Sequence, residues 1–286
     1  MLVTIIGLGL IGGSIGLSLR QGSRPGWEIV GCSRRQETVT NALRLGAIGR
    51  GEASLESAVK QADLVIIATP VLTIKEIFSA IAPHLSLGCA VTDTASTKVQ
   101  VMKWAKEILP PMVDFIGGHP MAGKESNGIQ AAEARLLRRC TYCLTPSENA
   151  SPKSIDMMTS MVKRLGAIPF FIDAQEHDNL VAGISHLPIL LSAALVSLTT
   201  KNPSWLTMSK LAASGYRDLT RLASGNAEVN SNICLSNKEA IIDWADKFSQ
   251  ELERYRQLVA REDNRLEQAL AEASKARQKW LKNLPS

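Results

Sequence analysis

Three glycines near the N-terminus, Gly7, Gly9 and Gly12, have the spacing of a turn that binds phosphate groups. The first glycine of such a turn permits a tight bend, the second lets backbone N–H groups approach a pyrophosphate, and the third lets a helix pack on the preceding strand. A strand-like stretch precedes them and an amphipathic stretch follows, as the motif requires. We expect Gly7, Gly9, Leu10, Ile11 and Gly12 to bind a dinucleotide; an ordinary glycine-rich turn is the alternative.

The end of the next strand-like stretch carries residues that distinguish between two dinucleotides. An Asp or Glu there would accept a hydrogen bond from the free ribose 2′-hydroxyl of NAD. This chain has Ser33, Arg34 and Arg35 instead, and a hydroxyl followed by two guanidinium groups suits a 2′-phosphate. We therefore expect NADP; the alternative is that the arginines lie in a solvated loop.

His119 lies in a glycine-rich sequence, residues 117–123, and could act as a general base. An enzyme that removes hydride from an alcohol needs a base for the hydroxyl proton, and imidazole, with an ordinary pKa of about 6.5, can accept it at neutral pH. We expect His119 in a loop that a cofactor can approach. His84 and His177 lie in polar or helix-edge contexts, and we expect no role for them.

Polar residues also follow the third and fourth strand-like stretches, where ligands of a parallel sheet bind. Thr69 and Pro70 would turn the chain over the cofactor, although a simple turn explains them equally well. The segment Asp93–Lys98 carries several hydroxyl groups, and Ser96 among them could hydrogen-bond a substrate. The alternative is that Asp93 to Ser96 cap the next helix.

The C-terminal half contains two further polar clusters. His186 precedes an apolar helix and could contact a ligand, or simply cap or pack. Arg217 and Arg221 are four residues apart, so on one helix they would share a face and could bind a carboxylate together. The alternative is a solvated face on which Asp218 is the ion-pair partner, and the local sequence leaves both interpretations open.

The elements that position these residues follow from the apolar pattern. Strand-like segments alternate with helical patterns as far as about Ile172, which predicts an α/β fold with a Rossmann-type, doubly wound, largely parallel sheet over residues 1–172. The segments are Leu2–Ile6, Ile29–Cys32, Leu64–Ala68, Ala90–Asp93, Val113–Ile116, Thr141–Thr145 and Ile168–Ile172.

Residues 173–286 have only helical periodicity, and we expect an all-α domain there. Leu187–Thr200 is predicted to be a buried core helix, too short to span a bilayer. A helical block of this size must bury its apolar faces, and pairing with a second copy would do so, which predicts a homodimer. A self-contained helical cap is the alternative.

Composition limits the remaining functions. The 286 residues are 45% hydrophobic, enough for a core, and the two domains account for the length, so no regulatory domain is expected. The net charge of +5 is not accompanied by a nucleic-acid motif, and we expect no nucleic-acid partner. Met1–Leu19 lacks the basic region of a signal peptide. We expect a cytoplasmic protein without a membrane partner.

Five scattered cysteines, an odd number, argue against a disulfide framework and indicate a reducing compartment. Cys140 and Cys143 match the CxxC spacing, but they lie in a predicted strand rather than at a helix N-terminus. We expect them to be structural, and we expect no metal site.

Taken together, these motifs resemble those of the prephenate/arogenate dehydrogenase family of tyrosine biosynthesis. The resemblance follows the family's order over nearly the whole chain, and it implies an N-terminal nucleotide-binding domain, a C-terminal helical dimerisation domain and an active site between them. It is carried by Gly7–Ser14, Asp93–Lys98, the HPMAG sequence that begins at His119, the SHLP sequence that begins at Ser185, and the DLTR sequence that ends at Arg221.

The resemblance also implies a reaction, the oxidative decarboxylation of a cyclohexadienyl substrate. The product would be tyrosine from arogenate, or 4-hydroxyphenylpyruvate from prephenate. By the same resemblance, His119 would accept the proton of the ring hydroxyl, and Ser96 would hydrogen-bond that hydroxyl. Arg221 would bind a substrate carboxylate, with Arg217 and His186 lining the same pocket.

The expected substrate depends on Glu125, two residues after the HPMAG sequence. Arogenate carries an ammonium group where prephenate carries a ketone, so a nearby carboxylate favours arogenate. With Ser33–Arg35, Glu125 leads us to expect an NADP-dependent arogenate dehydrogenase. Prephenate is the alternative substrate, and Glu125 could instead belong to an ion-pair gate.

Two other functions are compatible with the expected fold. Another NADP-dependent β-hydroxyacid dehydrogenase would also join a nucleotide-binding domain to a helical one, but such enzymes generally use a lysine base. A non-catalytic nucleotide-binding sensor would bind the cofactor without turnover, and His119 and Ser96 would then be packing residues.

Overall fold

The computed structural model describes residues 1–21, 26–124 and 126–283. The chain forms two compact units, Met1–Asn237 and Lys238–Ser286. Every candidate site residue named above except Glu125, which lies outside the described residues, belongs to the first unit.

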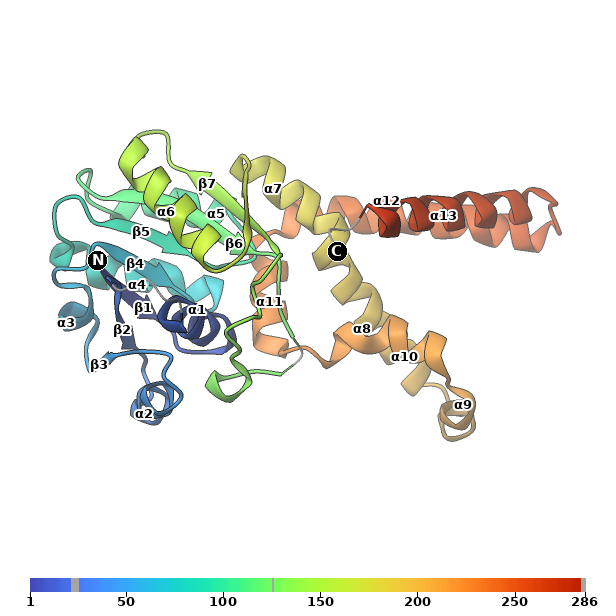
Figure 1. Cartoon of the computed structure of the whole chain (residues 1–286). Coiled ribbons are helices and arrows are strands. Elements are labelled where there is room, and N and C mark those ends of the chain that lie inside the picture. The colour runs from blue at the N-terminus through green and yellow to red at the C-terminus, as the bar shows by residue number, and fades with distance from the viewer. Residues whose placement is uncertain (22–25, 125, 284–286) are drawn as a thin grey trace. The chain divides into compact units, whose positions relative to one another are not determined.

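One sheet organises the first unit (Figure 1). The described residues form eight strands in the order β3-β2-β1-β4-β5-β6-β7-β8, and only β6 and β7 pair antiparallel. The predicted doubly wound, largely parallel sheet is therefore confirmed. The strands are β1 (Leu2–Ile6), β2 (Glu28–Cys32), β3 (Arg50–Glu52), β4 (Leu64–Ile67), β5 (Ala90–Asp93), β6 (Asp114–Pro120), β7 (Thr141–Pro146) and β8 (Ile168–Phe171).

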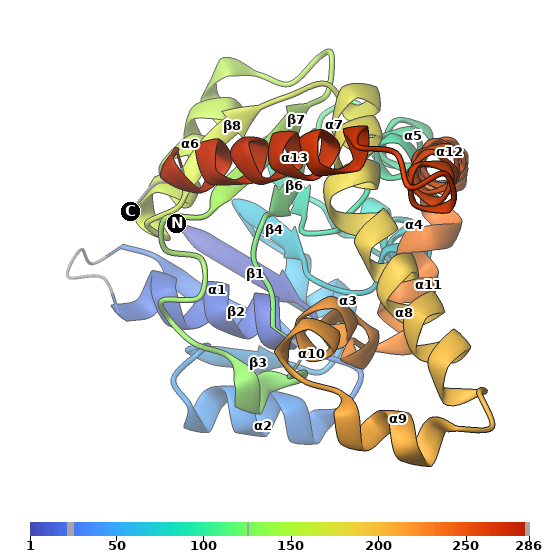
Figure 2. The same cartoon turned by 90° about the vertical axis from the view of Figure 1, so that its right-hand side faces the viewer.

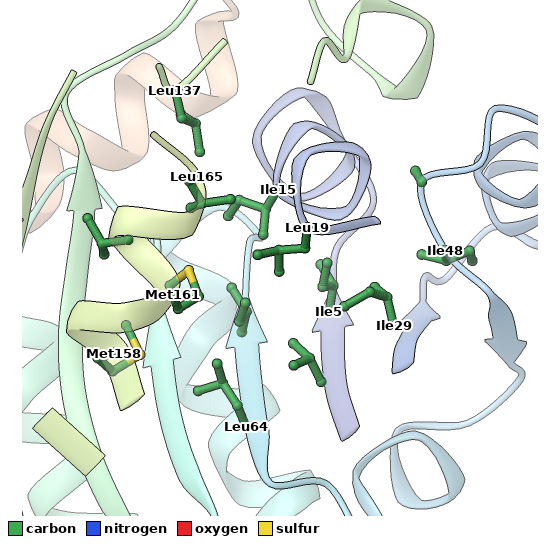
Figure 3. Close-up of a cluster of buried hydrophobic side chains, with 14 of the residues drawn as sticks. Ile5, Ile15, Leu19, Ile29, Ile48, Leu64, Leu137, Met158, Met161 and Leu165 are labelled. Atoms are coloured by element: carbon green, nitrogen blue, oxygen red, sulfur yellow. The ribbon is translucent and has the colours of Figure 1, made fainter. Parts of the chain in front are cut away.

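Helices cover both faces of this sheet, because its strands are apolar on both sides. In β4, for example, Ile66 packs into one core cluster and Ile67 into the other. Figure 3 shows the first cluster, in which side chains of α1 and α6 lie over strand residues such as Ile5. The helices are α1 (Leu10–Gln21), α2 (Gln36–Arg44) and α6 (Pro152–Arg164) on that face, and α3 (Leu55–Val59), α4 (Ile74–Ile81) and α5 (Val99–Ile108) on the other.

After β8 the first unit is helical. A π-helical turn, η4, joins α7 to α8, so the three form one long helix in Figures 1 and 2. Pro188 has no N–H to donate to the carbonyl four residues before it, and the Leu187 N–H donates to Ala182, five residues back. The segments are α7 (Ala174–Val181), η4 (Ala182–His186), α8 (Leu187–Thr200), α9 (Trp205–Leu211), α10 (Ser214–Thr220), the 3₁₀ segment η5 (Arg221–Ser224) and α11 (Ala227–Ser236).

The predicted helix Leu187–Thr200 is present with these bounds as α8, but the prediction that it is a buried core helix was wrong. The continuous helix spans Ala174–Thr200. Its length, and the mean hydropathy of 1.9 of its most apolar 18-residue window, would suffice for a membrane crossing, a criterion that core helices of soluble proteins also meet. Only 28% of its most apolar window is buried, and Leu198 is 74% exposed. The helix therefore presents an apolar face that the first unit leaves uncovered.

The second unit is a pair of helices, α12 (Lys238–Ala260) and α13 (Arg265–Lys282), which contact each other. In the turn between them, the Asp263 carboxylate accepts a hydrogen bond from the Arg265 N–H at 2.9 Å. These helices confirm the all-α character expected for the C-terminal part of the chain.

Candidate active site

A cavity of about 600 Å³ lies at the carboxyl ends of β1, β2 and β4. It is lined by Gly7 and Gly9 after β1, by Ser33–Arg35 after β2, and by Thr69 and Pro70 after β4. Ligands of doubly wound sheets bind at this edge. The structure thus gathers most of the predicted cofactor residues around one cavity.

The glycines of the first turn leave space that the side chain of any other residue type at these positions would fill. Gly7 has a φ of +94°, and a Cβ on Gly12 would lie 2.0 Å from the Gly7 carbonyl oxygen. The start of α1 can therefore approach the turn only without a side chain at residue 12. A Cβ on Gly9, in contrast, would meet no atom within 4 Å. This open space beside a helix N-terminus fits the pyrophosphate of a dinucleotide.

Leu10 and Ile11 form the first turn of α1 and are not among the residues that line the cavity. After β4, Pro70 precedes a 3₁₀ turn, η1 (Val71–Thr73), in which the Thr73 hydroxyl donates to the Thr69 hydroxyl at 2.9 Å. The chain therefore bends at Thr69 and Pro70 beside the cavity, as expected for either interpretation of this pair.

No acidic side chain directly follows β2 in the described sequence, where Ser33 leads into Arg34 and Arg35. The nearest strand partner with a carboxylate is Glu52 of β3, opposite Cys32. Glu52 forms an ion pair with Arg50 and is not a lining residue of the cavity. The residues at the end of β2 thus offer cationic and hydroxyl groups to a ligand.

His119 lies in β6 rather than in a loop, which corrects the prediction. Antiparallel pairing with β7 extends the strand to Pro120, four residues beyond the predicted end. The residue is only 7% exposed. Burial lowers the pKa of His119 well below its ordinary value, and His177, Lys98 and His186 add to this effect. His119 is therefore neutral at pH 7, the state that a general base requires.

His177, for which no role was expected, contacts His119. Its Nε2 lies 2.9 Å from His119 Nδ1, and its Nδ1 lies 2.7 Å from Asp178 Oδ1. The Asp178 carboxylate also accepts the N–H groups of Lys98 and Val99, so it acts as an acceptor towards His177 as well. With the Nδ1 proton of His177 donated to Asp178, the lone pair on His177 Nε2 can accept the Nδ1 proton of His119, and the lone pair of His119 then lies on Nε2.

The N-terminus of α5 is capped by a residue from another helix. Asp178 accepts the N–H groups of Lys98 at 2.7 Å and Val99 at 2.8 Å, so the alternative that Asp93 to Ser96 cap this helix was wrong. Asp93 instead forms a buried ion pair with Lys98 and accepts the Gly118 N–H at 3.0 Å. The Lys98 ammonium also donates to the Gly118 carbonyl at 2.6 Å. These contacts fix the backbone immediately before His119.

Ser96 and His186 lie close to this chain of histidines. His186 is fully buried, and burial lowers its pKa to about 4, against a smaller opposite effect of the Asp178 charge. The Ser96 backbone lies near enough to act on the pKa of His186, and His186 acts on that of His119. The structure therefore brings together His119, Ser96 and His186 from the predicted set.

Arg217 and Arg221 lie in another part of the first unit. α10 ends at Thr220 and Arg221 begins η5, so the two arginines do not share one α-helix as predicted. The Arg217 side chain is 81% exposed and its Nε lies 3.9 Å from Asp218 Oδ1, the ion pair that the alternative expected. α10 and η5 pack on α8, and Figure 1 shows α10 well away from the sheet.

The described residues include both cysteines of the CxxC pair, Cys140 and Cys143. Burial raises the pKa of the Cys140 thiol to about 11 and raises that of Cys143, so both thiols are protonated at neutral pH. In the part of the chain that the structure describes, no group of three or more His, Cys, Asp or Glu side chains could hold a metal ion.

The first unit combines a cavity at the glycine turn with a neutral imidazole, His119, which is hydrogen-bonded to a second imidazole and through it to a carboxylate. Such a pair of features can remove a hydroxyl proton while a nicotinamide accepts hydride. His177 and Asp178 were missed by the sequence analysis, and only the adjacency of His and Asp at the start of a helical region could have indicated them.

Comparison with known proteins matches one family to both the N-terminal and the C-terminal part of the chain. Residues 15–169 match the family model described as "Prephenate dehydrogenase, nucleotide-binding domain", and residues 173–273 match "Prephenate dehydrogenase, dimerization domain". A prephenate dehydrogenase of Bacillus subtilis is 36% identical over 266 residues, which are 91% of this chain and 71% of that protein.

Two solved structures are similar over nearly their full lengths. Synechocystis arogenate dehydrogenase has 31% identity and a TM-score of 0.83, and covers 98% of this chain and 100% of its own. Prephenate dehydrogenase from A. aeolicus, in complex with hydroxyphenyl propionate and NAD+, has 29% identity and a TM-score of 0.90, with 98% of each chain covered.

Proposed function

The chain belongs to the prephenate dehydrogenase family, and we propose that it catalyses the NADP-dependent oxidative decarboxylation of L-arogenate to L-tyrosine. The observation that carries this proposal is the hydrogen-bonded series His119–His177–Asp178, in which the Nδ1 atom of His119 contacts His177 and Nε2 is left as its basic nitrogen. His119 lies at the end of β6, and β5 separates this strand from β4, the nearest strand that borders the cofactor cavity.

In the proposed reaction, His119 Nε2 accepts the proton of the ring hydroxyl. A bound nicotinamide supplies the hydride acceptor. Loss of the ring carboxylate as CO2 leaves its bonding electrons in the ring, which becomes aromatic. The proton held by His119 can return to the phenol oxygen, so the base ends the cycle neutral. Ser96, in the loop after β5, is proposed to hydrogen-bond the same oxygen.

We propose a preference for NADP on the basis of the residues that follow β2. Ser33, Arg34 and Arg35 line the cavity, and their hydroxyl and guanidinium groups suit a 2′-phosphate. Glu52, opposite the end of β2, is ion-paired with Arg50 and does not line the cavity, and Glu76 of α4 is the carboxylate among the lining residues. NAD is the alternative cofactor, since the A. aeolicus relative was solved with NAD+.

The substrate preference is proposed on chemical grounds. A carboxylate at Glu125 would attract the ammonium group of arogenate, and Arg221, by its match to the family's DLTR arginine, would bind a substrate carboxylate, with His186 and Arg217 as further contacts. Prephenate is the second candidate, because the Bacillus subtilis relative is named a prephenate dehydrogenase.

A homodimer of this chain is proposed from the uncovered apolar face of α8. The matched dimerization-domain model includes this helix, and burial of residues such as Leu198 against a second copy would remove apolar surface from water. We propose residues 173–286 as the domain that forms this contact, and a cytoplasmic location for the enzyme.

The test is a set of four assays in which the purified chain receives arogenate or prephenate with NADP or NAD, and reduction of the nicotinamide is followed by absorbance. Turnover with arogenate and NADP alone is the expected result. Efficient turnover of prephenate would refute the substrate preference, and efficient use of NAD would refute the cofactor preference. Silence in all four assays would refute the proposed activity.

A further inference from the structure

Asn237, the last residue of the first unit, is buried beside the histidine site. It follows α11, and its side-chain Nδ2 lies 2.8 Å from the main-chain carbonyl oxygen of Asp178. The same nitrogen lies 3.2 Å from His186 Nδ1. One amide group therefore contacts both the residue that orients His177 and the ring of His186.

These two contacts determine which way the Asn237 amide faces. A main-chain carbonyl can only accept hydrogen bonds, so the atom opposite the Asp178 carbonyl must be the NH2 group. The same NH2 group faces His186 Nδ1 and can only donate to it. His186 Nδ1 is therefore the unprotonated nitrogen, and the neutral ring carries its proton on Nε2.

The proton on His186 Nε2 has no acceptor at full hydrogen-bond geometry. Among the described residues, this buried nitrogen has no partner within hydrogen-bond distance and angle, and the contact of the ring with the Ser96 main chain is the smallest of the four causes that act on its pKa. Leaving a buried donor unpaired costs about 1–3 kcal/mol, so an oxygen of a bound molecule would be favoured there. The ring lies close enough to the Ser96 backbone for that backbone to act on its pKa, and close enough to His119 to lower the pKa of His119.

We propose that Asn237 is a positioning residue that holds His186 as the Nε2–H tautomer, so that His186 presents a donor to a substrate oxygen. His119 then presents an acceptor and His186 a donor. Asp178 supports both rings, the first through its carboxylate and His177, and the second through its main-chain carbonyl and Asn237. The part of this inference that concerns substrate rests on the proposed function, whereas the tautomer does not.

The test is nitrogen-15 NMR of the full chain with labelled histidine, because long-range proton–nitrogen correlations distinguish the tautomers of each ring. The chain has only four histidines, and His186→Gln identifies the signals of His186. The wild-type protein is expected to show His186 as Nε2–H. A wild-type spectrum with the proton on Nδ1 would overturn the proposal without any variant having to fold.

Two variants separate positioning from simple packing. Asn237→Asp replaces the donor by an acceptor and should move the His186 proton to Nδ1. The matched control is Ser236→Ala, which removes a contact of 3.0 Å to the Thr97 hydroxyl at the same helix end and should retain Nε2–H. If Asn237 only stabilises the end of α11 by packing, both variants will show the wild-type tautomer of His186, and the proposal fails.

A kinetic measurement tests the substrate part. Asn237→Ala should raise the KM for the cyclohexadienyl substrate by about tenfold, the cost of one hydrogen bond to a charged group. The KM for NADP should stay unchanged. An unchanged substrate KM would refute the role of His186 as a donor to substrate. If the protein shows the Nε2–H tautomer of His186 but no turnover, the proposed function is refuted and the inference about the tautomer is retained.

Discussion

Acidification should destabilise this fold through His186. The ring is fully buried, and burial lowers its pKa to about 4. In the unfolded chain the same group has its ordinary pKa of about 6.5. Between these two values the unfolded state binds a proton that the folded state does not, so the free energy of unfolding falls as the pH falls.

The size of this effect follows from the two pKa values. Relative to neutral pH, one histidine with these values lowers the free energy of unfolding by about 2 kcal/mol at about pH 5. His119 acts in the same direction, because its folded pKa also lies well below the ordinary value. Carboxylates with a lowered pKa, such as Asp114, lose their stabilising contribution mainly at lower pH.

The assay is urea denaturation at about pH 7.5 and about pH 5, at one protein concentration because assembly shifts apparent stability. His186→Gln should lose about 2 kcal/mol less than the wild type over this interval. Ser236→Ala removes a neighbouring polar contact but no titratable group, and it should keep the full acid dependence. Equal acid dependence of His186→Gln and the wild type would refute the reasoning.

Four further variants test the site. His177→Leu removes the acceptor for His119 Nδ1 and should lower kcat by about ten- to a hundredfold with a smaller change in KM; an unchanged kcat would show that the ring is only packed there. Arg34→Ala combined with Arg35→Ala should weaken NADP binding and leave NAD binding unchanged in titrations. An unchanged preference for NADP over NAD would show that the residues after β2 do not bind the 2′-phosphate. Gly12→Ala should lower both the melting temperature and the NADP affinity, because its Cβ would meet the Gly7 carbonyl. Gly9→Ala should keep the wild-type melting temperature and lose only NADP affinity. Equal melting temperatures of the two glycine variants would count against this geometry.

The sequence predicted the parts of the fold that have a local signal. The strands of a parallel sheet are buried on both faces, so continuous apolar stretches such as Leu64–Ile67 stand out. β3 has three residues and half-exposed side chains, and it carries no periodic pattern. The extension of β6 through His119 depends on its partner β7, which no pattern within β6 itself reveals.

The candidate site was predictable where function demands a residue type locally, as in the glycine turn and the histidine of the HPMAG sequence. His177 was missed because its role arises from a contact with a residue 58 positions earlier in the chain. Asp178 likewise caps a helix that begins some 80 residues before it. Long-range polar contacts of this kind are made by tertiary packing, and the only local signal for these contacts is the adjacency of His177 and Asp178.

The most direct test of the central claim is the turnover rate of His119→Asn with arogenate and NADP, measured beside NADP affinity. Asparagine keeps the polarity of the site but cannot accept the hydroxyl proton. The account predicts a loss of turnover of at least about a hundredfold with NADP affinity nearly intact. A fully active His119→Asn enzyme would contradict the assignment of His119 as the base.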